Sequence, residues 1–183
     1  AVGYDLYCKM LNEAVKEAKG IPQQEEFETT IDLNVDAYIP GTYIPNEFQK
    51  LDIYKRIAGI ENQEEYEDML EELMDRFGEP PKAVQNLLAI AALKAMAHRL
   101  YITEVKQMGE EFRLTMHERA QVNLAAIPQL LKAYGEELSF KAEGTPWFLY
   151  RPRKRRPKDV LPVLEKAREL LEKMNVLVEE KKD

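Results

Sequence analysis

Hydrophobic positions along the chain alternate between a helical period and a strand period. The spacing at residues 4–18 predicts a first helix, which ends before Gly20-Ile21-Pro22. Apolar and polar residues then alternate from residue 30 to residue 39, which predicts a strand with one buried face. Two Tyr-Ile-Pro triplets fix the angle between this strand and the next helix. Asn46 caps that helix, which ends at Gly59. We expect one face of that helix to consist of Phe48, Leu51, Tyr54, Ile57 and Ala58.

The rest of the chain predicts two more helices and then a mixture of hairpins and helices. Tyr66–Phe77 has the clearest amphipathic spacing and ends at Gly78, and Lys82–Leu100 is apolar nearly all round. The pattern then predicts a hairpin (residues 102–108 and 112–116), a short helix (127–134), a second hairpin (138–142 and 147–151) and a last helix capped by Asp159. This order predicts an α+β fold, in which helices pack with a small, mostly antiparallel sheet.

The chain length of 183 residues suits one domain, or one domain with an appendage. Because Ala1 lies inside the predicted first helix, we expect the chain to be part of a longer protein. We expect residues 1–20 to form that helix, residues 21–27 to be a polar linker, and residues 28–183 to form the α+β domain.

Cysteine usage and hydropathy indicate a cytoplasmic protein. Cys8 is the only cysteine, so no internal disulfide can form, which suits a reducing compartment. The longest uninterrupted apolar run, Leu87–Leu93, is far too short to span a membrane. No leader of the secretory type opens the chain, and we expect no membrane contact.

Charge is distributed very unevenly. The net charge is -7, and the segment from Glu61 to Phe77 holds eight acidic residues and one base, Arg76. Within the predicted helix Glu65, Asp68, Glu72 and Asp75 follow one another at i, i+3, i+7 and i+10 and form a stripe. The stripe is either a solvated helix face or a docking surface for a basic partner, and it would repel nucleic acid. Few basic partners at i+4 offset its repulsion, which favours docking.

A basic segment, residues 151–158, can also be interpreted in two ways. Its six basic residues are Arg151, Arg153, Lys154, Arg155, Arg156 and Lys158. The segment follows Trp147, Phe148 and Tyr150, a pattern typical of nucleic-acid patches. Pro152 and Pro157 make it a connector, and pairing with an acidic surface of the chain or of a neighbouring domain explains it as well.

The sequence contains no constellation typical of an enzyme. No phosphate-binding glycine loop and no nucleophile elbow is present. One cysteine and two scattered histidines do not supply a zinc site. We therefore expect this chain to have no catalytic residues, no metal and no cofactor of its own.

Three segments resemble a known family. They are "VGYDLYCKMLNEAV", "IDLNVDAYIPGTYIPNEFQKLDIYKRIAG" and "EELMDRFGEPPKAVQNLLAIAALK". Together they resemble the C-terminal part of the bacterial transcription-repair coupling factors (Mfd), and the resemblance extends from the start of the chain to about Met116. Tyr4 stands where the family pattern has phenylalanine, and Lys50 stands where arginine is common.

The resemblance implies a regulatory domain of a motor protein. Residues 2–19 are similar to the helix that ends the ATP-driven module for translocation on double-stranded DNA, and residues from Phe27 onward are similar to the C-terminal domain. Family members displace stalled RNA polymerase and recruit UvrA, a protein of nucleotide excision repair, through a UvrB-like module. The C-terminal domain acts as an autoinhibitory clamp that covers that module. ATP and magnesium are expected only in the motor module.

The resemblance also implies a partner for the acidic stripe. We expect Glu72 and Asp75 to pair with basic residues of the UvrB-like module, with Asp68 and Glu65 extending the contact and Arg76 holding the helix end. The alternative is an accessory domain that contacts DNA through residues 151–158.

Overall fold

The structure is a computed structural model that describes residues 27–153 and 162–179. The predicted first helix, the linker and Asp159 lie outside these residues. The last helix begins at Val163 with Pro162 as its N-cap residue, so the prediction that Asp159 caps it is wrong. The chain forms two compact units, one of residues 1–28 and 35–95 and the other of residues 29–34 and 96–183. No helix in the described part is long and apolar enough to cross a membrane.

The first unit is helical. It contains α2 (Glu47–Ala58), α3 (Gln63–Phe77) and most of α4 (Lys82–Arg99). Its core is made almost entirely of aliphatic side chains from these helices and the loop before them: Ile39, Ile44, Ile53, Ile57, Ile60, Met69, Leu73, Val84, Leu87, Leu88 and Ala91. Asn46 caps α2 through its side chain, which accepts a hydrogen bond from the Gln49 N–H. The three predicted helices of this region are thus confirmed.

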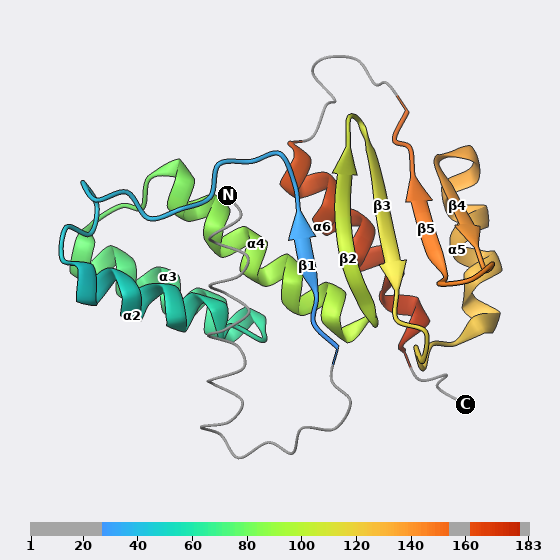
Figure 1. Cartoon of the computed structure of the whole chain (residues 1–183), viewed down its shortest axis with the longest axis horizontal. Helices are drawn as coiled ribbons and strands as arrows, with labels where there is room; N and C mark the ends of the chain where they lie inside the picture. Colours follow the sequence, from blue (N-terminus) through green and yellow to red (C-terminus); the bar gives the residue numbers. More distant parts are fainter. Residues whose placement is uncertain (1–26, 154–161, 180–183) are drawn as a thin grey trace. The chain divides into compact units, whose positions relative to one another are not determined.

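The second unit is built on a five-stranded sheet with the order β1-β2-β3-β5-β4. The strands are β1 (Thr30–Asp32), β2 (Ile102–Met108), β3 (Glu111–Met116), β4 (Leu138–Lys141) and β5 (Trp147–Tyr150). Only β1 and β2 pair in parallel, and the other neighbours are antiparallel. Helices α5 (Ile127–Tyr134) and α6 (Val163–Met174) lie behind the sheet in the view of Figure 1. The predicted α+β fold and mostly antiparallel sheet are confirmed.

The first strand is shorter than the alternation predicts. Burial continues to alternate from Ile31 to Ile39, as expected, but the ladder ends at Asp32. Beyond that point the backbone finds other partners: the Tyr38 N–H donates to the Ala83 carbonyl, and the Asp36 carbonyl accepts from the Asn86 side chain. The segment is therefore extended, but it is hydrogen-bonded to α4 and not to a neighbouring strand. The alternation of apolar and polar residues cannot distinguish these two arrangements.

Candidate docking surface

One of the predicted docking residues, Glu65, takes part in the N-terminal cap of α3. The Asn62 side chain accepts a hydrogen bond of 2.8 Å from the Glu65 N–H, and a Glu65 carboxylate oxygen accepts one of 2.9 Å from the Glu61 N–H. The first bond satisfies a backbone donor that the first turn of a helix leaves open, and the second ties the residue before Asn62 to the same turn. The carboxylate of Glu65 thus serves the helix itself.

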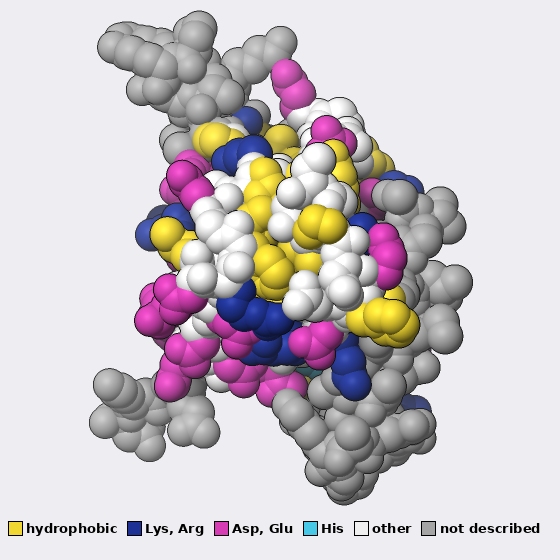
Figure 2. Space-filling model, turned by 90° about the vertical axis from the view of Figure 1, so that its left-hand side faces the viewer, with side chains coloured by type: hydrophobic (Ala, Val, Ile, Leu, Met, Phe, Trp, Pro, Cys, Tyr) yellow, Lys and Arg dark blue, Asp and Glu magenta, His cyan; other side chains and the backbone are white. Residues whose placement is uncertain are grey.

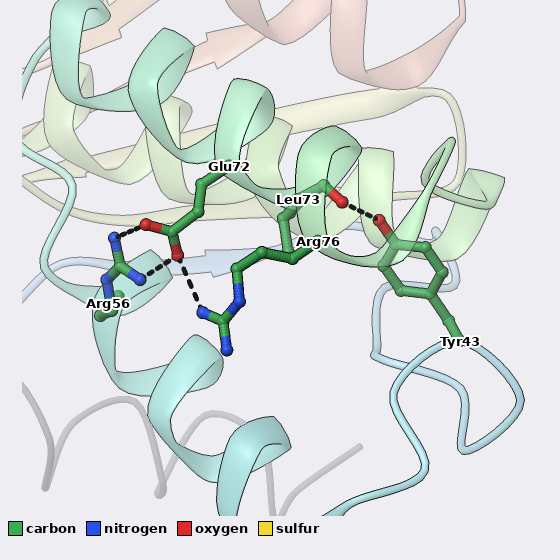
Figure 3. Close-up of polar contacts among 5 residues, drawn as sticks. All are labelled: Tyr43, Arg56, Glu72, Leu73 and Arg76. Carbon is green, nitrogen blue, oxygen red and sulfur yellow. Dashed lines mark hydrogen bonds and ion pairs between the residues drawn. The ribbon is translucent and has the colours of Figure 1, made fainter.

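Glu72 lies at the centre of an ion pair between two helices. Arg56 on α2 donates from both terminal nitrogens to the two oxygens of Glu72 on α3, and the Nη2–Oε1 distance is 2.8 Å. Arg76, one turn further along α3, donates to Glu72 Oε2 at 3.1 Å. Figure 3 shows the carboxylate held between the two guanidinium groups. The Arg76 guanidinium also lies over the ring of Phe77 at 4.9 Å from its centre.

This arrangement shifts the ionisation of both partners. The hydrogen bond from Arg56 is the main reason that the pKa of Glu72 lies below its usual value of 4.5, and the positive charges of Arg56 and Arg76 act in the same direction. The same hydrogen bond raises the pKa of Arg56. Glu72 is therefore charged and already paired. One partner, Arg76, is the base at i+4, and the other, Arg56, lies on a neighbouring helix, where the spacing along α3 does not reveal it.

A different row of carboxylates faces the solvent. Glu64, Asp68, Glu71 and Asp75 are all exposed, and they are spaced at i, i+4, i+7 and i+11 along α3. This spacing keeps them on one line, opposite the buried Met69 and Leu73. No hydrogen bond or ion pair joins these four side chains to any other described residue. We call these four residues the acidic ridge. Figure 2, which views the left-hand side of Figure 1, shows many acidic side chains toward its lower left, with basic ones beside them.

The loop between the two prolines is tied to the helices by tyrosine hydroxyl groups. The Tyr43 hydroxyl donates to the Gly78 carbonyl at 2.8 Å and to the Leu73 carbonyl at 3.2 Å, and Figure 3 shows the bond to Leu73. The Tyr54 hydroxyl accepts a 2.8 Å hydrogen bond from the Ile39 N–H. Partial burial raises the pKa of Tyr43, so its hydroxyl stays protonated and able to donate. The loop thus fixes the end of α3 that carries Asp75.

Two apolar residues of α2 lie on the surface, against the expectation that they belong to its packed face. Phe48 is 86% exposed and Leu51 is 54% exposed. The buried side of α2 is centred on Ile53 and Ile57, both at 0%. The five residues of the predicted face span a wide arc, and the side that includes Phe48 and Leu51 points away from the core.

The described part of the basic segment is paired within the chain. Arg151 Nε lies 3.0 Å from a Glu111 carboxylate oxygen, and Arg153 Nη2 lies 3.6 Å from one of Glu136. The remaining candidates, Lys154, Arg155, Arg156 and Lys158, lie outside the described residues. The two arginines that can be placed therefore follow the second interpretation of the segment, which is pairing with acidic groups of the chain.

Among the described residues, no group of three or more His, Cys, Asp or Glu side chains could hold a metal ion. Both histidines take part in local hydrogen bonds. The Nδ1 atom of His98 lies 3.2 Å from the Thr29 hydroxyl, and that of His117 accepts from the Arg119 N–H. These contacts fit structural roles for both rings.

Comparison with known proteins gives a consistent result. The family model "TRCF domain" matches residues 33–127. The chain is 40% identical over 147 residues to the transcription-repair-coupling factor of Bacillus subtilis (strain 168), a match that covers 79% of this chain and 12% of that protein. It is 41% identical over 125 residues to that of Staphylococcus aureus (strain USA300), which covers 67% of this chain and 11% of that protein. The matches thus span about a tenth of these relatives.

A solved structure agrees with the family model and with the two relatives. The crystal structure of the C-terminal domain of transcription-repair coupling factor superposes with a TM-score of 0.72 at 26% identity, over 87% of this chain and 99% of that one. The alignment covers almost all of the solved domain, and the family model covers the helical unit and the first hairpin. The chain is a C-terminal TRCF domain and belongs to the transcription-repair coupling factor family.

Proposed function

We propose that this chain is a non-catalytic regulatory domain that docks on the UvrB-like module of its own polypeptide and covers the surface that recruits UvrA. The observation that carries the proposal is the acidic ridge, four exposed carboxylates without partners among the described residues. Such a row suits a basic surface on a neighbouring domain. Contacts between domains of one chain are modest in area and polar, which allows them to open.

We infer that the predicted residues contribute unequally to the contact. Asp68 and Asp75 belong to the ridge and are available to a partner, whereas Glu65 is engaged in the helix cap and Glu72 in its pair with Arg56. We infer that Asp68 and Asp75 make the main ion pairs and that Glu72, held beside them, adds negative potential. Arg76 contributes by holding Glu72.

The parent polypeptide supplies the chemistry in this proposal. ATP and magnesium act in its motor module, which contacts double-stranded DNA, and RNA polymerase and UvrA meet the chain only through the other modules. An equilibrium between closed and open forms needs only a few kcal/mol of differential binding to switch. Loss of one ion pair of about 1 to 3 kcal/mol would therefore shift the balance toward the open form about tenfold or more.

The first test is binding in trans. This chain is titrated against the isolated UvrB-like module, and we expect Asp68→Lys with Asp75→Lys to weaken the complex at least about tenfold. The matched control is Glu110→Lys with Glu118→Lys, two exposed acids of the second unit with the same change of charge. Equal affinity of the ridge variant and the unmodified chain would refute docking through the ridge.

The second test uses the full-length parent protein. There Asp68→Lys with Asp75→Lys, or Glu72→Lys with Asp75→Lys, is expected to raise both UvrA binding and basal DNA-dependent ATPase activity. The Glu110→Lys and Glu118→Lys control is expected to leave both unchanged. Values that stay at the level of the unmodified protein in both ridge variants would contradict the clamp.

A further inference from the structure

One face of the sheet in the second unit is not covered by α5 or α6, the two α-helices that pack on the other face. Figure 1 shows α5 and α6 behind the sheet, so the opposite face is turned to the viewer. Directly paired residues of neighbouring strands point to the same side. The pairs Ile31–Val105, Val105–Leu114 and Leu114–Phe148 are buried and lie on the helix side. The residues between them in each strand therefore form the open face.

The open face carries an aromatic ring at its centre. Trp147 on β5 lies opposite Thr115 on β3 and Lys141 on β4. The Arg113 guanidinium lies over the Trp147 ring, 4.6 Å from its centre. Trp147 is partly exposed and Arg113 is exposed, so the stack of ring and guanidinium reaches the solvent. Leu149, the neighbour of Arg113 on β5, is 9% exposed and forms the base of this region.

Exposed positive charge lies on both sides of the ring. Lys106 lies opposite Arg113, and Lys106, Arg113 and Lys141 are all exposed. The acidic residues of this face are Asp32 at its edge, the half-buried Glu104, and Glu111, which is paired with Arg151. The three exposed cations thus lie on three strands on both sides of Trp147.

The two units also differ in overall charge. The sequence of the second unit contains 17 lysines and arginines against 15 acidic residues, a net charge of +2, whereas the first unit carries -9. The first unit therefore repels a polyanion more strongly than the second does.

We propose that this open sheet face binds single-stranded DNA, with bases stacked on the Trp147–Arg113 pair and phosphates contacted by Lys106 and Lys141. An aromatic platform bordered by cations is the arrangement that proteins use for single strands, because every base has a face that can stack. In a duplex those base faces are hidden, so a duplex offers only its phosphates. No contact in this arrangement requires a ribose hydroxyl, so a DNA strand is sufficient. The site is independent of docking by the acidic ridge and uses none of its residues.

Trp147 is the only tryptophan of the chain, so tryptophan fluorescence reports on this site alone. We expect an unlabelled thymidine 20-mer to quench Trp147 fluorescence, and the affinity of a labelled 20-mer, followed by anisotropy, to fall as salt rises. The same titrations with a duplex, an RNA strand and a poly-glutamate peptide are the comparison arms. Binding to the duplex or the peptide that equals binding to the thymidine strand would overturn the proposal, as would binding to RNA alone.

Substitutions on the open face test whether this face is responsible for binding the single strand. Lys106→Ala with Lys141→Ala is expected to lower the affinity at least about tenfold and to reduce the slope of log K against log salt by about 1.4, since each phosphate contact with a single strand contributes about 0.7. Lys132→Ala with Lys173→Ala removes two exposed charges from α5 and α6, behind the sheet, and is expected to change neither value. Equal loss in the two double variants, or an unchanged affinity in the first, would refute the site.

Discussion

Arg56 on α2 and Glu72 on α3, 16 residues apart along the chain, are joined through both terminal guanidinium nitrogens and both carboxylate oxygens, so that the pair ties the two helices together. A bidentate pair has defined geometry and holds its partners in one orientation. It therefore sets the position of α2 beside the acidic ridge and leaves one predicted docking carboxylate occupied.

The ion pair is expected to stabilise the helical unit modestly. Both side chains are about a third or more exposed, so we expect a coupling energy of about 0.5 to 1 kcal/mol between Arg56 and Glu72. Urea denaturation of Arg56→Ala, Glu72→Gln and the double variant gives this energy as a double-mutant cycle. A coupling near zero would show that water competes fully for the pair.

Stability should depend on pH through Glu72. Its pKa is lowered in the folded chain, so the charged carboxylate stabilises the fold above pH 4.5, and this contribution is lost as the pH falls through the lowered pKa. The difference in unfolding free energy between the chain and Glu72→Gln is therefore expected to be constant near neutral pH and to shrink in acid. Urea denaturation from pH 7 to pH 3 measures it. Glu71→Gln is the control, since Glu71 has no described partner.

Tyr43→Phe should loosen the end of α3. The substitution removes hydrogen bonds to the carbonyl oxygens of Leu73 and Gly78, and we expect a loss of about 1 kcal/mol of unfolding free energy. Hydrogen exchange of the last turn of α3 should accelerate in the same variant. Tyr38→Phe serves as the control because Tyr38 is 52% exposed and its hydroxyl has no recorded partner. An equal loss in both variants would mean that the Tyr43 bonds contribute nothing specific.

Gly78→Ala is expected to be destabilising although it meets no steric obstacle. A Cβ at this position finds no atom within 4 Å, but the backbone has φ +86 and ψ -168, a region that only glycine adopts readily. We expect a loss of about 1 to 3 kcal/mol in thermal or urea denaturation. Gly41→Ala has an ordinary backbone and only the Lys50 Nζ atom at 4.0 Å, so it should be neutral or slightly stabilising.

Local patterns predict the elements of this chain well because each one has its own terminal signal. The Asn46 cap, the stop at Gly78 and Pro128 in the first turn of α5 are all present in the structure. The two hairpins are found within one residue of the predicted bounds: β3 begins at Glu111 instead of residue 112, β4 ends at Lys141 instead of residue 142, and β5 ends at Tyr150 instead of residue 151. Neighbouring residues determine these features, so sequence reasoning reaches them.

Features that depend on distant residues could not be predicted in the same way. Arg56 lies on another helix than Glu72, and no spacing rule connects the two. The placement of Glu64 and Glu71 on the ridge is different, because it follows from helical spacing within α3 and the sequence already contained that signal. The strand order, in which β3 pairs with β5 and leaves β4 at the edge, depends on tertiary packing. The exposure of Phe48 follows from which side of α2 meets the core.

The parallel pairing of β1 with β2 has a consequence for how the chain folds. Ile31 meets Val105 although the two are 74 residues apart in the sequence, and α2, α3 and α4 all lie between them along the chain. Closing so long a loop is entropically unfavourable, whereas helices in adjacent stretches of chain collapse quickly. Pulse-labelling hydrogen exchange should therefore find α2 and α3 protected early and β1 last, which makes the edge strand the final piece to join the sheet.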